Sequence, residues 1–123
     1  MLAALALTAC GGGGGHHATA QATGKKSPAY VRQCLRAAKL RVIGGPAPPG
    51  DTNAPATELI VGGGQSSAFL AFYENPKRAA KYAPDIRANA KHLNATVERY
   101  GKLTIVWVRG AGSDEAQTIR GCA

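Results

Sequence analysis

The feature that most constrains the fold is a helix-start signal that occurs twice in the chain. Ser27-Pro28 and Asn75-Pro76 each place a side chain that can cap a helix directly before a proline suited to its first turn. Strand-like segments follow each of the two predicted helices. The chain from residue 27 onward is therefore expected to repeat an order of one helix and two strands.

The first predicted helix begins after Ser27 and has one apolar side. Its apolar residues recur at the spacing of a single buried helix face, and they are Val31, Cys34, Leu35 and Ala38. The basic residues Arg32, Arg36 and Lys39 fall on the other side. Cys34 is therefore expected to point toward the core.

The second predicted helix extends from Asn75-Pro76 to His92. Its apolar residues also follow helical spacing, and they are Ala79, Ala80, Ala83, Ile86 and Ala90. Pro84 lies inside this run. Because proline removes a backbone donor and clashes with the preceding turn, we expect a kink or a break there.

Strands are predicted from short apolar runs bounded by turn residues. Two hairpins are expected: Glu58–Val61 with Ser67–Tyr73 across Gly62–Gly64, and Thr96–Tyr100 with Leu103–Val108 across Gly101-Lys102. Leu40–Ile43 is a further candidate strand. The stretch from Gly44 to Ala56 holds four prolines and is expected to be a loop.

These elements predict an α+β domain with a duplicated αββ pattern, in which helices cover one face of an antiparallel sheet. A short C-terminal helix is expected after Ser113, with Asp114 and Glu115 in its first turn, where the helix dipole favours acids. We expect it to pack beside the first helix. The order resembles a permuted ferredoxin-like sandwich, an architecture that implies no particular activity.

A second motif lies near the start of the chain. Leu7-Thr8-Ala9-Cys10 follows a short apolar run and resembles the lipobox of bacterial lipoproteins, in which the cysteine is lipidated and the residues before it are removed. The resemblance implies that residues 1–9 are a signal peptide. It also implies a lipid anchor on Cys10 and a location on the extracytoplasmic face of the cell membrane. The alternative is an ordinary N-terminus that happens to hold a cysteine.

The flanks of this motif agree with the resemblance in two respects and depart from it in one. The run Leu2–Thr8 is far shorter than the ~20 residues of a spanning helix, as expected of a signal peptide. Residues 10–26 include Gly11–Gly15 and lack apolar periodicity, so they are predicted to form a flexible tether reaching roughly 20–25 Å. No Lys or Arg precedes the apolar run, so we expect the natural start codon to lie upstream. Residues 27–123 remain for one small domain.

The lipoprotein resemblance assigns a role to the two other cysteines. With Cys10 lipidated, Cys34 and Cys122 remain as a pair in an oxidising compartment, where a disulfide between them is expected. The alternative is a catalytic thiol. Its histidine partner would be His92, since the other two histidines lie in the tether.

The chain is strongly basic, with a net charge of +8. Basic residues crowd the second predicted helix, and they are Lys77, Arg78, Lys81, Arg87 and Lys91. Asp85 is the one acid opposing them in that helix. These five residues are the candidate binding site for an anionic partner: anionic lipid, a wall polymer or an envelope protein, but not nucleic acid. The alternatives are an ordinary solvated helix face and a charge that serves solubility alone.

No catalytic residue, metal site or cofactor is predicted. The sequence contains no Ser-His-Asp, metal-ligand or redox spacing. Gly62-Gly63-Gly64 is expected to be a hairpin loop rather than a phosphate loop, because the lysine spacing of such a loop and a following helix are missing. Residues distant in sequence can still meet in the fold, so an enzyme remains an open alternative.

The folded part resembles small lipoproteins of GC-rich Gram-positive bacteria. The resemblance is carried by Cys34–Ala38, Ala68–Tyr73, Val106–Val108 and Arg120–Cys122. It implies no activity or substrate. The leading hypothesis is therefore a membrane-anchored domain that binds an envelope partner or an anionic polymer. A small cell-envelope enzyme and a structural domain that lies on its own membrane are the alternatives.

Overall fold

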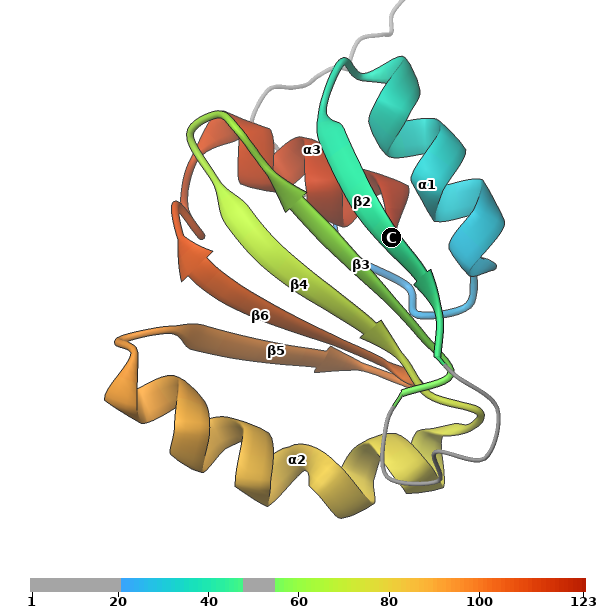
Figure 1. Cartoon of the computed structure of the whole chain (residues 1–123), viewed down its shortest axis with the longest axis vertical. Coiled ribbons are helices and arrows are strands. Elements are labelled where there is room, and N and C mark those ends of the chain that lie inside the picture. The colour runs from blue at the N-terminus through green and yellow to red at the C-terminus, as the bar shows by residue number, and fades with distance from the viewer. Residues whose placement is uncertain (1–20, 48–54) are drawn as a thin grey trace, which may run out of the picture.

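A five-stranded antiparallel sheet with three helices forms the fold of this chain (Figure 1). The computed structural model describes residues 21–47 and 55–123. The elements in chain order are α1 (Pro28–Ala37), β2 (Arg41–Pro46), β3 (Thr57–Gly62), β4 (Ser67–Phe72), α2 (Pro76–His92), β5 (Thr96–Tyr100), β6 (Leu103–Arg109) and α3 (Asp114–Cys122). The strands are ordered β2-β3-β4-β6-β5. The predicted α+β class, the antiparallel sheet and the short C-terminal helix are confirmed.

The three predicted helix caps are confirmed. The Ser27 hydroxyl accepts the backbone N–H of Tyr30 at 3.1 Å. The Asn75 side chain accepts the N–H of Arg78 at 2.9 Å, and the Ser113 hydroxyl accepts that of Ala116 at 3.0 Å. Each cap satisfies a backbone donor that the helix itself leaves unpaired.

The prediction that the helices all cover one face of the sheet is wrong. Leu70 of β4 packs into the main core with residues of α1 and α3, whereas its neighbour Ala71 packs against Ala79 of α2. Because successive strand residues point to opposite faces, α2 lies on the other face. The two faces are called the α1/α3 face and the α2 face below. Helices are needed on both faces because Ala68–Tyr73 is a continuous apolar run, in which successive side chains on the two faces of β4 must both be buried.

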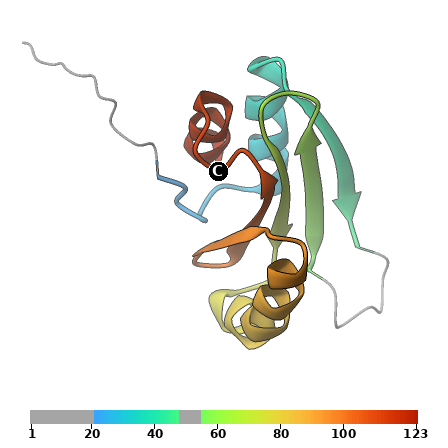
Figure 2. The same ribbon diagram turned by 90° about the vertical axis from the view of Figure 1, so that its left-hand side faces the viewer.

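The predicted pairing of Cys34 with Cys122 is confirmed. The disulfide joins α1 to α3 with a Cα–Cα distance of 5.6 Å. The two helices lie side by side on the same face of the sheet (Figures 1 and 2). The last helix therefore packs beside the first, as expected.

The strand β2 is longer than predicted. Gly44-Gly45-Pro46, expected to begin a loop, pairs in register with Thr57–Leu59 of β3. Gly44 has a φ of +106°, and a Cβ there would lie 2.2 Å from the Glu58 carbonyl oxygen. Pro46 is accommodated because β2 is an edge strand, where proline is tolerated.

The end of the predicted tether belongs to the folded domain. Ala22 is buried, and the Gly24 N–H donates to the Ala123 carbonyl at 3.3 Å. Gly24 has a φ of +70° and lies so close to Tyr100 that a Cβ would collide with its carbonyl oxygen. Residues 22–26 are therefore packed rather than flexible. The predicted signal peptide, Cys10 and the remainder of the tether lie outside the described residues.

The helix α2 is continuous at Pro84, so the break, one of the two expected outcomes, does not occur. It runs as one helix from Pro76 to His92. Pro84 and Ala80, whose carbonyl loses its helical partner, are both exposed, so water can satisfy that oxygen. No helix within residues 21–47 and 55–123 has the length and apolar character needed to cross a membrane.

Candidate functional site

The exposed side of α2 carries four of the five predicted site residues. The helix packs on the sheet through Ala79, Ala83 and Ala90, which are buried. The 3.6-residue helical repeat places the opposite side toward solvent. The four exposed cations on that side, called the α2 basic face below, are Lys77, Lys81, Arg87 and Lys91.

The fifth predicted residue, Arg78, is used within the fold. It is half-buried, and its Nε lies 3.8 Å from Oε1 of Glu74. Lys81 is exposed but also contacts the fold, since its Nζ lies 5.6 Å from the centroid of the Tyr82 ring. Tyr82 in turn stacks on Tyr73 of the sheet at 5.9 Å. The structure thus groups four of the predicted cations and separates Arg78 from them.

None of the four cations of the α2 basic face forms an ion pair within the described residues, although Asp85, the one acid of the helix, is exposed one turn after Lys81. Within the described parts of the chain, the side-chain ion pairs are Arg78–Glu74 and Arg120–Glu98. The face instead contains like-charge neighbours one helical turn apart, Lys77 with Lys81 and Arg87 with Lys91. Such neighbours destabilise a helix by about 0.2–0.5 kcal/mol each. Fold stability therefore does not explain this arrangement.

An open hollow of about 620 Å³ lies at the start of α2. Its lining residues are Glu74, Asn75, Lys77, Arg78, Ala80 and Lys81. Five of these six side chains end in a polar or charged group, including the Glu74 carboxylate, although most of the exposed lining is apolar. The hollow offers room for a bulky anionic group beside the first two cations of the α2 basic face.

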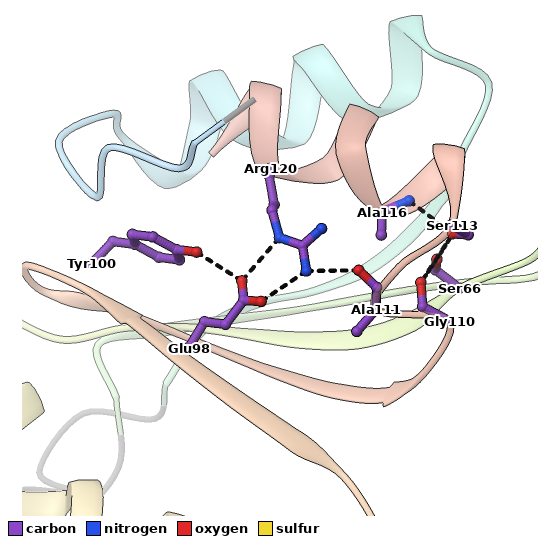
Figure 3. A network of polar contacts seen from close by, with 8 residues as sticks. All are labelled: Ser66, Glu98, Tyr100, Gly110, Ala111, Ser113, Ala116 and Arg120. Carbon is purple, nitrogen blue, oxygen red and sulfur yellow. Dashed lines mark hydrogen bonds and ion pairs between the residues drawn. The ribbon is translucent and has the colours of Figure 1, made fainter. Parts of the chain in front are cut away.

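Outside α2, the buried Arg120 of α3 forms hydrogen bonds within the fold (Figure 3). Its Nε and Nη2 donate to the Glu98 carboxylate at 3.0 and 2.7 Å, and Nη2 also donates to the Ala111 carbonyl at 2.7 Å. The guanidinium lies 4.6 Å from the centroid of the Trp107 ring. The Tyr100 hydroxyl donates to Glu98 at 2.8 Å. This network ties α3 to β5 and β6.

The network perturbs the protonation of its members in the direction expected of a stable ion pair. Hydrogen bonds from Arg120 lower the pKa of Glu98, although partial burial opposes them, and the Tyr100 hydroxyl adds to the lowering. Desolvation, followed by the neighbouring Glu98 carboxylate, raises the pKa of Tyr100. The hydrogen bonds to Glu98 raise the pKa of Arg120. All three groups are held in their ordinary charge states, which indicates a structural role.

The glycine-rich turn is the predicted hairpin loop, and it is tied to α3. It connects the antiparallel strands β3 and β4. The Ser66 N–H donates to Oε1 of Glu115 at 2.9 Å. The Ser66 hydroxyl donates to the Gly110 carbonyl at 2.7 Å, a contact drawn in Figure 3. A Cβ on Gly64 would lie 2.1 Å from the Glu115 carboxylate, so a larger residue there would displace the end of the Glu115 side chain.

The residues considered for catalysis are not brought together. Cys34 is bonded to Cys122, which removes the free thiol that the catalytic alternative needs. His92 is exposed at the end of α2. The described residues contain no group of three or more His, Cys, Asp or Glu side chains placed to hold a metal ion.

Comparison with known proteins yields no relative from which a function could be transferred. No family model matches the chain, and neither a curated protein nor a solved structure matches it significantly. The assignment of function therefore depends on the residues and their geometry.

Proposed function

We propose that this chain is a membrane-anchored extracytoplasmic lipoprotein whose folded domain binds an anionic envelope partner through the α2 basic face. The observation that carries the proposal is the exposed row of Lys77, Lys81, Arg87 and Lys91, which forms no ion pair within the described residues. A wall polymer or an acidic envelope protein would supply the missing negative charge.

The lipoprotein part of the proposal is supported by two features. Leu7-Thr8-Ala9-Cys10 resembles a lipobox. The Cys34–Cys122 disulfide suits a domain that folds in an oxidising compartment. The packed part of the domain starts at Ala22, twelve positions after Cys10, and a glycine-rich tether of that length reaches roughly 20 Å. The domain would thus be held close to the membrane surface.

A second candidate function is contact with the protein's own membrane. The α2 basic face extends from Lys77 near the start of the helix to Lys91 near its end. Each Lys or Arg near an anionic leaflet contributes about 1 kcal/mol of attraction. The same four cations would then lie on lipid headgroups, and the partner would be the membrane to which Cys10 is anchored.

The binding proposal is tested by removing four charges from two different surfaces. The full chain carrying Cys10→Ala is compared with a variant in which Lys77, Lys81, Arg87 and Lys91 are replaced by Gln. A matched control replaces the exposed residues Lys25, Arg36, Lys39 and Arg99 by Gln. The probes are synthetic poly(glycerol phosphate) and vesicles containing phosphatidylglycerol, each titrated at low and high salt.

We expect the α2 variant to lose at least about tenfold in affinity for one of the probes, and the control to lose much less. Loss toward the polymer supports the first candidate, and loss toward vesicles alone supports the second. Equal losses in the two variants would show that only net charge matters and would contradict a specific site.

The anchor is tested by mass spectrometry of the protein isolated from its natural membrane. We expect a mature chain that begins at an acylated Cys10 and is lighter by two hydrogens because of the Cys34–Cys122 bond. An unmodified Cys10 in the isolated protein would contradict the lipoprotein proposal while leaving the binding proposal open to its own test.

A further inference from the structure

The α2 face of the sheet bears a continuous apolar row that crosses all five strands. Adjacent residues of the row are direct cross-strand partners. In strand order the row consists of Ile43, Ile60, Phe69, Val106 and Val97. Because the residues are in register, their side chains form one ridge perpendicular to the strands.

Much of this row is left open to solvent. Ile43 is 57% exposed, and Ile60, Phe69, Val97 and Val106 are half-buried. The helix α2 lies along β5 and reaches β4 at Ala71, whereas no helix of the described chain lies in front of β2 and β3 (Figure 1). An apolar groove of about 360 Å³ runs beside the row, between the sheet and the last turns of α2. Contiguous exposed apolar surface of this kind often marks a site of interaction.

Two opposite charges flank the row on opposite sides. Arg41 lies two residues before Ile43 on β2, and Glu58 lies two residues before Ile60 on β3. Since β2 and β3 are antiparallel, the two side chains stand on either side of the Ile43–Ile60 pair. Both are exposed, and neither has an ion-pair partner within the described residues.

Each of these charges has a glycine as its cross-strand partner. Arg41 pairs with Gly62, and Glu58 pairs with Gly45. Gly62 leaves the surface beside Arg41 low, whereas the Arg32 side chain, which donates to the Gly44 carbonyl, lies close to Gly45 on the Glu58 side.

We propose that the apolar row is the contact surface for a second copy of this chain. A two-fold axis along the open end of the row places Ile43, Ile60 and Phe69 each opposite its own copy, as in an isologous dimer, while Val106 and Val97 lie beside α2. The same axis places Arg41 of one copy over Gly45 of the other, next to Glu58. The contact is made twice, so the charges around the row are self-complementary. Glu58 also lines the groove.

The exposed part of the row is small compared with a standard interface of about 1,600 Å². The dimer is therefore weak. Sedimentation velocity of the full chain carrying Cys10→Ala, from micromolar to millimolar concentration, should show a monomer converting reversibly to a dimer.

Charge exchange tests the arrangement. Arg41→Glu and Glu58→Arg should each weaken the dimer at least tenfold, and the double exchange should restore most of the loss. Ile43→Glu should abolish the dimer, whereas the control Tyr30→Glu, at a similarly exposed position on α1, should leave it unchanged. Far-UV circular dichroism verifies that each variant is folded.

A chain that remains monomeric throughout the concentration range would overturn the proposal. So would a dimer that persists in the Ile43→Glu variant, or a double exchange that fails to restore association. Vesicle binding by a monomer that is lost in the Ile43→Glu variant would assign the row to lipid and would also overturn it. These outcomes are separate from the tests of the α2 basic face, because none of the exchanged residues belongs to it.

Discussion

Arg120 and the cations of α2 are basic residues of one chain in opposite situations. The Arg120 side chain is 9% exposed. Its guanidinium donates hydrogen bonds to Glu98 and to the Ala111 carbonyl and lies over the face of the Trp107 ring. Lys77, Arg87 and Lys91 are exposed, and nothing in the described chain neutralises them. The first cation holds the fold together, and the others are available to something outside it.

The difference between Arg120 and the cations of α2 separates basic residues that stabilise the fold from basic residues that remain available for binding. A cation that is withdrawn from water must be paired, because an unpaired buried charge is costly. A cation that stays in water needs no partner for stability. The proposed anionic partner would offset the repulsion between such cations on the α2 basic face.

The largest expected effect is on the region around α3, which is held both covalently and by charge. Replacing Cys34 and Cys122 together by Ala should lower the free energy of unfolding by about 4–5 kcal/mol, because the bond closes a long loop in the unfolded chain. Urea denaturation measures the change. Retention of the original midpoint would show that the bond contributes nothing to the stability of this region.

Replacing Arg120, the cation paired with Glu98, should lower the free energy of unfolding by nearly as much. Arg120→Met leaves the Glu98 carboxylate with only the Tyr100 hydroxyl and should cost about 2–4 kcal/mol. Urea denaturation again provides the measurement, with Arg36→Met on the exposed side of α1 as the control. Equal stability of the two variants would remove the distinction between paired and unpaired cations.

Lowering the pH should weaken the ion pair between Glu98 and Arg120. The pKa of Glu98 is lowered in the folded chain, so its ion pair stabilises the fold fully above the ordinary value of 4.5. That stability is lost as the pH falls from 4.5 through the lowered pKa. The wild-type chain should therefore lose more stability than Glu98→Gln in this range, as followed by thermal unfolding. Parallel losses in the two chains would argue against the ion pair.

The smallest expected effect is on the stability of α2. Replacing Lys77, Lys81, Arg87 and Lys91 by Gln removes two like-charge neighbours and should raise the free energy of unfolding by up to about 1 kcal/mol. Thermal unfolding at low salt detects the change. A clear loss of stability would mean that these cations serve the fold, and it would contradict their assignment to a partner.

Local signals predicted much of the fold. The caps at Ser27, Asn75 and Ser113 are set by residues adjacent in sequence, and the structure has all three. The pairing of Cys34 with Cys122 followed from the lipobox resemblance of Cys10, and it too is present. Each of these inferences needed only a short segment or a count of cysteines.

The features that were missed depend on contacts between distant segments. Arg120 meets Glu98 across 22 positions, and neither residue belongs to a motif. The apolar row follows from the register of five strands, which no single strand encodes. The continuous apolar run Ala68–Tyr73 could have revealed that β4 is covered on both faces, and hence where α2 lies.

The central claim is that the α2 basic face, rather than the basic chain as a whole, meets the anionic partner. The most direct measurement is a nuclear magnetic resonance titration of the isotopically labelled chain, carrying Cys10→Ala, with poly(glycerol phosphate). We expect the amide shifts to change most around Lys77, Lys81, Arg87 and Lys91 and to return to their original positions on addition of salt. Changes that centre on Arg36 and Lys39 of the α1 region, or that spread evenly over all exposed cations, would contradict the claim.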